Sequence, residues 1–188
     1  MITALVVATV IGVPVTIGVV GAATSGGDSD SSSGSGFGDL DTEFLDDGLI
    51  TTAIEEAESS AAAVKGATPV ELSVDEYGLT ITYYDPNRDQ VRTFEKDAYD
   101  PAGYQVQVED NYFEDYRPRP LPLEDLDPAV FVEVGEGAIE ESEEPYSYQV
   151  SAKADLDSGE LRIRADVSDG GGDDVVEVTD ADGDVVER

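Results

Sequence analysis

The chain has 188 residues, with 43 Asp and Glu against 10 Lys and Arg, and contains no His, Cys or Trp. Without Cys there is no disulfide, thiolate nucleophile or Cys-ligated zinc, and without His there is no imidazole base or usual transition-metal site. A formal net charge of −33 repels a phosphate backbone, so nucleic acid is excluded as a partner.

Residues 1–23 predict a transmembrane anchor. No charged side chain occurs from Ile2 to Ala23, and about 20 apolar residues in a helix cross a hydrocarbon core of roughly 30 Å. A cleaved signal peptide is the alternative, because the stretch ends in small residues where a signal peptidase can cut. The length of the run and the lack of a basic segment before it favour the anchor. We expect a single-pass cell-membrane protein with an extracytoplasmic body, and a secreted protein as the alternative.

Residues 24–43 predict a flexible linker. They are mostly Ser, Gly and Asp, which bury too little apolar surface to offset the entropy of ordering. A Gly/Ser chain of about 18 residues reaches roughly 20–25 Å, which is enough to hold a small domain clear of lipid head groups.

Residues 44–116 predict a first α+β unit. Apolar residues recur at helical spacing after Asp47, a predicted N-cap, and Gly66 supplies a stop, so we expect a helix over 48–65. Alternation of apolar and polar residues between turn signals then predicts an antiparallel meander. Its four strands are expected at 70–74, 79–84, 91–94 and 104–108.

Residues 117–126 predict a proline-rich connector, because closely spaced prolines exclude a strand ladder. Residues 127–188 predict a second α+β unit, in which Asp127 caps a helix over 128–141 that is weakened by two glycines. Four further strands are expected at 146–154, 161–167, 175–178 and 185–186.

The order of one helix and then four strands thus occurs twice, which indicates a tandem duplication. At an offset of 78 residues Val70–Val74 aligns with Tyr148–Ala152. A unit of about 70 residues has a thin core and gains by packing against a second one. We predict an α+β fold with an N-terminal transmembrane helix and two tandem helix-plus-antiparallel-meander units, each helix covering its own sheet.

Segments of the folded region also carry a family resemblance. They are the helical Ile54–Ala57, the Gly-Ala-Thr-Pro-Val stop at 66–70, the alternating hairpin after it and a closing hairpin at 175–186. This layout, over residues 48–188, resembles the PepSY-like α+β domains of bacterial envelope proteins. Such domains often occur in tandem behind an N-terminal anchor, so the resemblance implies an extracytoplasmic binding or regulatory module. It transfers no site residue.

Asp180, Asp182 and Asp184 are the candidate metal ligands. They alternate around Gly183, but an EF-hand loop places its glycine sixth, whereas here it falls fourth. A tight hairpin turn explains the same residues, and the acids of residues 166–174 are interpreted in the same way, as a mobile loop. We therefore predict no cofactor and no metal site.

Arg117, Arg119, Tyr112 and Tyr116 are the candidate partner-binding residues. The two arginines are the one local basic spot, and they can hold an acidic partner or pair with acids of the chain. The two tyrosines can be exposed binding aromatics or can pack against the second helix.

Acids spread over turns and polar faces, with only three Lys, indicate adaptation to high salt or to a surface rich in divalent cations. We predict a non-enzymatic, membrane-anchored extracytoplasmic binding or regulatory module whose partner is an envelope protein or polymer. The alternative is a secreted acidic protein that binds divalent cations or cell-wall polymer. An enzyme that uses paired carboxylates is the third hypothesis. Ser151 and Lys153 share one face of a predicted strand, which is the minimum geometry for a Ser–Lys pair, but a solvated polar face of the hairpin explains the same residues.

Overall fold

The computed structural model describes residues 40–60, 62–99, 103–110, 118–171 and 174–187, so the predicted anchor and most of the predicted linker lie outside it. These residues form an α+β fold in which no helix has the length and apolar character of a membrane span. The elements are α1 (Asp47–Ser59), β1 (Thr68–Asp75), β2 (Gly78–Asp85), β3 (Gln90–Asp97), β4 (Gln105–Asp110), the short 3-10 helix η1 (Leu123–Asp125), α2 (Pro128–Glu141), β5 (Pro145–Ala154), β6 (Leu161–Asp169), β7 (Val175–Thr179) and β8 (Val185–Glu187).

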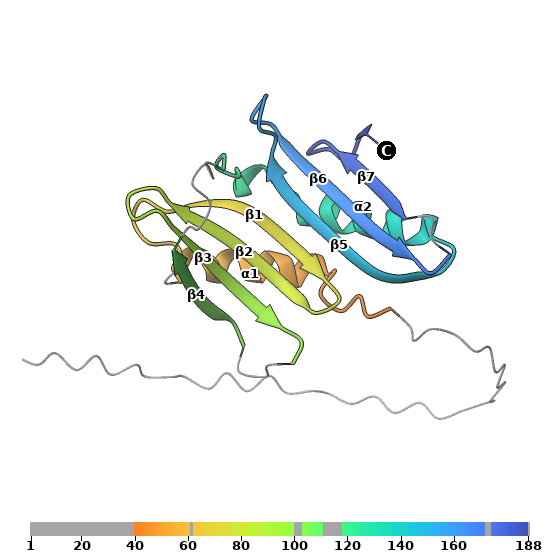
Figure 1. Cartoon of the computed structure of the whole chain (residues 1–188), viewed down its shortest axis with the longest axis horizontal. Helices are drawn as coiled ribbons and strands as arrows, with labels where there is room; N and C mark the ends of the chain where they lie inside the picture. The colour runs from red at the N-terminus through yellow and green to blue at the C-terminus, as the bar shows by residue number, and fades with distance from the viewer. Residues whose placement is uncertain (1–39, 61, 100–102, 111–117, 172–173, 188) are drawn as a thin grey trace, which may run out of the picture. The chain divides into compact units, whose positions relative to one another are not determined.

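All eight strands form one antiparallel sheet in the order β4-β3-β2-β1-β5-β6-β7-β8 (Figure 1). The prediction of a separate sheet for each helix is therefore wrong. The two meanders join edge to edge, with Leu72 of β1 opposite Ala152 of β5 and Val74 opposite Val150. Pairing satisfies the backbone groups that each meander alone would leave open at its first strand.

The join between β1 and β5 has a local two-fold relation. Ser73 lies opposite Ser151, and these two residues are separated by the offset of 78 that aligns the two strands in the sequence. The strand order of the sheet reads outward from this pair in the same way on both sides. The two repeats of the sequence are therefore related by a local two-fold axis between β1 and β5, at the centre of the sheet.

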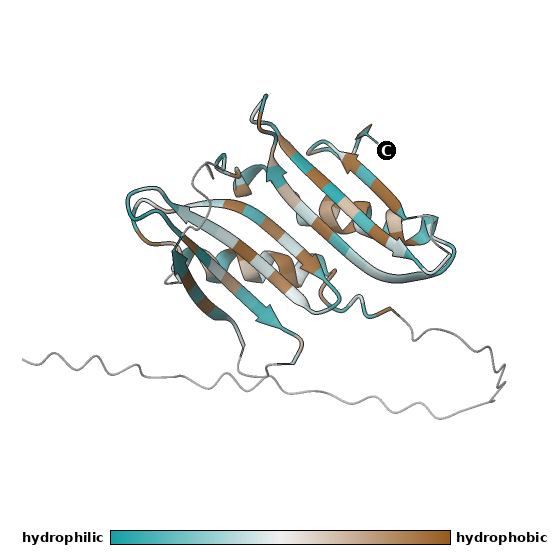
Figure 2. Ribbon diagram, in the orientation of Figure 1, coloured by the Kyte–Doolittle hydropathy of each residue, from teal (hydrophilic) through white to brown (hydrophobic). Residues whose placement is uncertain are grey.

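Both helices lie on one face of the sheet, α1 behind β1–β3 and α2 behind β5–β7 (Figure 1), and they also contact each other. Apolar residues alternate with polar ones along the strands (Figure 2), so one face of each strand turns toward the helices. The buried side chains form a single cluster that draws on both halves of the chain, including Ile50, Leu72, Ile81, Phe131, Val150 and Ile163.

Helix α1 is shorter than the predicted 48–65. Its N-cap is Asp46, whose carboxylate accepts a hydrogen bond from the backbone N–H of Leu49 at 2.7 Å. It ends at Ser59 because the hydroxyls of Ser59 and Ser60 donate to the carbonyls of Glu56 and Ala57, and these bonds compete with continued helix. The predicted stop at Gly66 lies beyond the true end.

Helix α2 has the predicted bounds, with Asp127 as its N-cap and Pro128 in its first turn. Gly135, which the sequence suggests only weakens the helix, has a packing role. A Cβ atom at this position would lie 2.7 Å from Val150 and 2.9 Å from Leu45. The missing side chain lets α2 approach the centre of the sheet closely.

The connector between the halves packs into the core. Leu121, Leu123 and Leu126 are buried, and the backbone N–H of Leu121 donates to the carbonyl of Pro69 at the start of β1, at 2.7 Å. Residues 118–122 join no strand ladder, as predicted, although residues 123–125 form the 3-10 helix η1, and the leucines belong to the core cluster.

Asp169, expected in a mobile loop, is a buried structural acid. Its carboxylate accepts hydrogen bonds from the Ser142 hydroxyl at 2.6 Å, the Glu144 N–H at 3.0 Å and the Gly171 N–H at 2.6 Å. These bonds, chiefly the one from Ser142, lower the pKa of Asp169 from 3.8 to about 2. The residue thereby ties the end of α2 to the end of β6.

We expect Asp169→Asn to lower the melting temperature at pH 7. Because the folded pKa is depressed, the stabilisation by Asp169 is complete above its unfolded pKa of 3.8 and disappears as the pH falls through about 2. In thermal unfolding between pH 2 and pH 7, the difference in melting temperature between this variant and wild type should become smaller toward pH 2. Asp157→Asn, in an exposed turn, is the control, and an equal effect of both substitutions would contradict this role.

Candidate functional site

A hollow of about 380 Å³ at one end of the sheet is the candidate site, and we call it the tyrosine pocket. Four chain segments build it: the residues before α1, the β1–β2 turn, the residues after β3 and the start of β5. Its lining residues are Leu40, Asp41, Glu43, Glu76, Tyr77, Ala98, Tyr99 and Tyr146. Because Tyr146 comes from the second meander, the pocket is complete only where the two meanders pair.

Residues 40–43, predicted as the end of the linker, belong to the folded body. Leu40 packs against the core, and Phe44 and Leu45 directly after this segment are buried. The backbone N–H of Glu43 donates to the Asp41 carboxylate at 3.0 Å, which fixes the bend of the segment. The described part of the chain therefore begins at the rim of the tyrosine pocket.

Local hydrogen bonds hold the two loops that carry Tyr77 and Tyr99. The carboxylate of Asp75 accepts from the N–H groups of Tyr77 and Gly78 at 2.8 and 2.9 Å, which closes the β1–β2 turn. The N–H of Ala98 donates to the carbonyl of Tyr77 at 2.8 Å. These bonds set the two loops side by side at the pocket.

Three tyrosine side chains of the pocket are exposed, at 56% for Tyr77, 78% for Tyr99 and 54% for Tyr146. The rings of Tyr77 and Tyr99 lie 6.4 Å apart between centroids, with an interplanar angle of 31°. Rings that are this exposed bury less apolar area than rings in the core, so they contribute less to the stability of the fold. They group around one hollow, which makes this hollow the candidate site.

The pocket has a negative potential. The carboxylate of Glu76 raises the pKa of the Tyr77 hydroxyl, with smaller contributions from burial and from Tyr99. Below the surface, burial raises the pKa of Tyr148, and the charges of Asp75 and Glu76 add to this effect. The Tyr148 side chain is 3% exposed, and its hydroxyl has no hydrogen-bond partner among the described residues.

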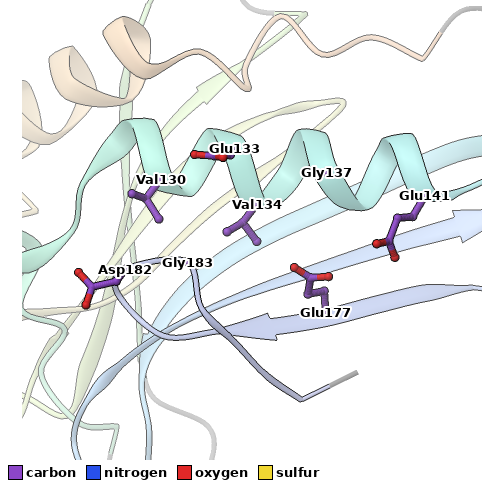
Figure 3. Close-up of a pocket in the computed structure, with 8 residues that line it drawn as sticks. All are labelled: Val130, Glu133, Val134, Gly137, Glu141, Glu177, Asp182 and Gly183. Atoms are coloured by element: carbon purple, nitrogen blue, oxygen red, sulfur yellow. The ribbon is translucent and has the colours of Figure 1, made fainter.

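A second groove, of about 290 Å³, runs between α2 and β7 (Figure 3). Val130, Val134 and Gly137 lie along the helix side of it. The carboxylates of Glu141 and Glu177 point toward each other across the groove, whereas Asp182 points away from it (Figure 3).

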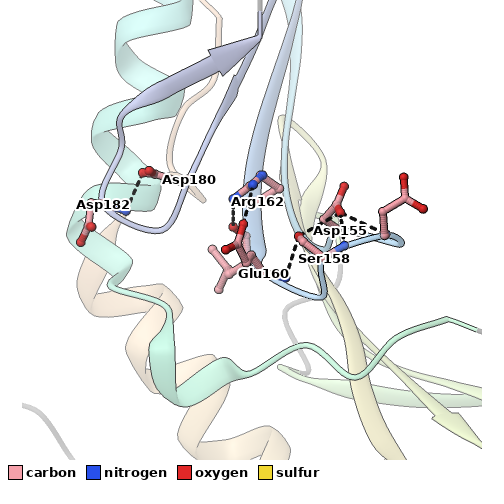
Figure 4. A network of polar contacts seen from close by, with 8 residues as sticks. Asp155, Ser158, Glu160, Arg162, Asp180 and Asp182 are labelled. Carbon is pink, nitrogen blue, oxygen red and sulfur yellow. Dashed lines mark hydrogen bonds and ion pairs between the residues drawn. The ribbon is translucent and has the colours of Figure 1, made fainter.

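The predicted metal candidates form a turn. The Asp180 carboxylate accepts from the N–H groups of Asp182 and Asp184, both at 3.0 Å, and Gly183 has a φ of +85°. The turn at Asp155 is closed by its own carboxylate in the same way (Figure 4). Over the part of the chain that the structure describes, no group of three or more acids is placed to hold a metal ion.

Of the predicted partner-binding residues, the structure describes only Arg119. Its Nε donates to the carbonyl of Leu156 at 2.6 Å and its Nη2 to that of Asp157 at 3.3 Å. Arg119 therefore fastens the connector to the β5–β6 turn. Arg117, Tyr112 and Tyr116 lie outside the described residues.

Ser151 and Lys153 lie at the join of the two meanders. Ser151 is opposite Ser73, and the Lys153 ammonium lies 2.9 Å from the Glu71 carboxylate across the same strand pair. Lys153 thus forms a cross-strand ion pair, as is usual on a polar sheet face.

No sequence pattern assigns a site role to Tyr77, Tyr99 or Tyr146. A local signal was present, because Tyr77 lies between Glu76 and Gly78 in a predicted turn, and turns lie at the protein surface. The meeting of the three tyrosines depends on the β1–β5 pairing, for which the local sequence carries no signal.

Comparisons with known protein families, with characterised proteins and with solved structures find no match to the chain.

Proposed function

We propose that the chain is a non-enzymatic, membrane-anchored extracytoplasmic binding module that holds an envelope protein or polymer at the tyrosine pocket. The grouping of three exposed tyrosines around one hollow carries this proposal. Tyrosine supplies a broad ring face and a polar hydroxyl with few rotatable bonds, which suits recognition at a wet surface. The absence of His and Cys from the chain supports binding over catalysis.

The proposed anchor and the acidic composition support a location of this module outside the cell membrane. Residues 1–23 are the proposed single membrane span, and the linker from residue 24 gives the body its reach. A charge of −33 suits a salt-rich exterior, where counter-ions screen the carboxylates.

The body as two tandem PepSY-like units is part of the same proposal. Its support is the repeated order of one helix and four strands, and the coincidence of the 78-residue offset with the Ser73 and Ser151 pair. Duplication of a unit with one open edge strand would give this eight-stranded sheet directly.

Extraction and N-terminal sequencing test the anchor. The full-length protein is expected in the membrane pellet, released by detergent and not by high salt, with its original N-terminus. A mature chain that starts at Ala23 or Thr24 would instead identify the secreted alternative.

We expect the Tyr99→Ala/Tyr146→Ala variant to lose binding to envelope material from the cells that make the protein. Removing two aromatic anchors from one site should raise the Kd by about tenfold or more in a co-sedimentation titration. Leu156→Ala is the matched control, because Leu156 is 69% exposed in the distant β5–β6 turn. Equal binding by all three proteins would contradict the assignment of the pocket.

A further inference from the structure

We infer that the tyrosine pocket is selective for an organic ammonium group, an alkylated nitrogen cation such as that of choline. This inference rests on the proposed function, because it names the ligand chemistry of the same pocket. Its volume of about 380 Å³ is in the range of small-molecule sites.

The charges around the pocket favour a cation over an anion. Asp41, Glu43 and Glu76 line it, and neither Lys nor Arg is among its lining residues. A ligand with a carboxylate or phosphate at the contact point would be repelled, whereas a cation would be attracted. A neutral sugar can stack on the rings but gains nothing from this potential.

The aromatic rings of the pocket also favour a cation. The face of an aromatic ring carries the negative part of its quadrupole, so a cation over tyrosine is attracted to it. Tyr77 and Tyr99 are adjacent at 6.4 Å, and Tyr146 approaches from the other meander. An organic cation has an apolar surface as well as a charge, and it can use both the rings and the carboxylates.

The arrangement of the described carboxylates favours an organic cation over a metal ion. The Asp41 carboxylate already accepts the N–H of Glu43, and none of the acids described by the structure forms a cluster of three that could hold a metal. A metal ion needs converging oxygen ligands at short distance. An ammonium group with alkyl substituents needs only a negative potential and surfaces to contact.

The raised pKa values of two tyrosine hydroxyls indicate that the negative potential extends from the pocket surface into the core below it. The charge of Glu76 raises the pKa of Tyr77 at the surface and contributes to that of Tyr148 in the core, and Asp41 also acts on Tyr148. Carboxylates that disfavour a phenolate stabilise a bound cation for the same electrostatic reason.

Titration of the full-length protein in a neutral detergent with tetramethylammonium and with choline tests the inference. The chain has nine Tyr and no Trp, so its intrinsic fluorescence reports on tyrosine directly. We expect a saturable change that KCl at the same concentration does not give. We expect 3,3-dimethyl-1-butanol, the neutral isostere of choline, to bind at least about threefold more weakly.

Matched variants test whether choline binds at the tyrosine pocket. Tyr99→Leu should weaken choline binding by about 3- to 30-fold because it keeps apolar bulk but removes the ring face, whereas Tyr99→Phe should remain within about twofold. Glu76→Gln should weaken binding several-fold, and Glu124→Gln, an exposed acid of η1, should not.

The outcomes separate this inference from the proposed function. Equal binding of the neutral isostere, binding of neutral oligosaccharide only, or an equal response to KCl would overturn the ammonium assignment, while tyrosine-dependent envelope binding would still stand. If the wild-type protein shows neither tyrosine-dependent envelope binding nor choline binding, the ammonium assignment and the proposed function are both overturned. Binding of free choline supports the ammonium assignment. Tighter binding to phosphatidylcholine vesicles than to phosphatidylglycerol vesicles would identify a lipid head group as the source of the ammonium group, in place of an envelope protein or polymer.

Discussion

Neither half of the eight-stranded sheet is expected to fold when it is expressed alone. Cutting the chain between residues 116 and 118 leaves β1 and β5 as open edges and uncovers Leu72, Val74 and Val150, which are fully buried in the intact body. A unit of about 70 residues without disulfide or metal seldom supplies more than about 3–5 kcal/mol of stability. Loss of the β1–β5 pairing removes much of this stability.

Circular dichroism melts of fragments 40–116 and 118–188, beside the intact body 40–188, measure this effect. We expect each fragment alone to lack a cooperative transition, and an equimolar mixture to recover one at a midpoint that rises with concentration. Gly135→Leu in the intact body is a second variant, since its side chain would meet Leu45 of the first half as well as Val150 of its own half. Two fragments that each melt cooperatively at the temperature of the intact body would show independent domains.

A large gain in stability from potassium chloride is the second expected result. The net charge of −33 opposes compaction, and the ion pairs in the described part of the chain, such as Arg88 with Asp85 and Lys153 with Glu71, are partly solvent-exposed. The Debye length falls from about 10 Å at 0.1 M salt to about 3 Å at 1 M. A relief of about 3 kcal/mol in repulsion would raise the Tm by about 6–12 °C in a body of this size.

Melts of the body from low to molar KCl check this, with the Glu133→Gln/Asp182→Asn variant as a comparison. Both residues are exposed beside the α2 groove, so we expect this variant to melt higher than wild type at low salt and to lose the advantage at high salt. A Tm that does not rise with KCl contradicts the account. A rise with millimolar calcium beyond that given by KCl at equal ionic strength would instead identify a specific cation site.

Local features of this fold could be predicted from the sequence. The N-cap Asp127 and Pro128 after it define the start of α2, and alternating residues give the eight strands within a few positions of their ends. The turn at Asp180 follows from its Asp-Gly chemistry. Each of these features depends on neighbours within a few residues, which is the range over which sequence patterns act.

Features that depend on distant contacts could not be predicted. The pairing of β1 with β5 joins residues about 80 positions apart, and two separate sheets would satisfy the same alternation. The end of α1 at Ser59 depends on a competition between hydroxyl and backbone hydrogen bonds, which helical spacing does not reveal. The tyrosine pocket follows from the pairing of β1 with β5, since Tyr146 reaches it only through β5.

Photo-crosslinking in living cells tests the central claim, that the tyrosine pocket holds an envelope ligand, most directly. A photoreactive phenylalanine analogue placed at Tyr99 of the full-length protein keeps a ring at the 78% exposed position of the pocket. The same analogue at Leu156, which is 69% exposed in the β5–β6 turn, is the control. We expect a discrete envelope-derived adduct from position 99 that is absent from position 156 and is reduced by Tyr146→Ala. Identical adducts from both positions, or none from position 99, would contradict it.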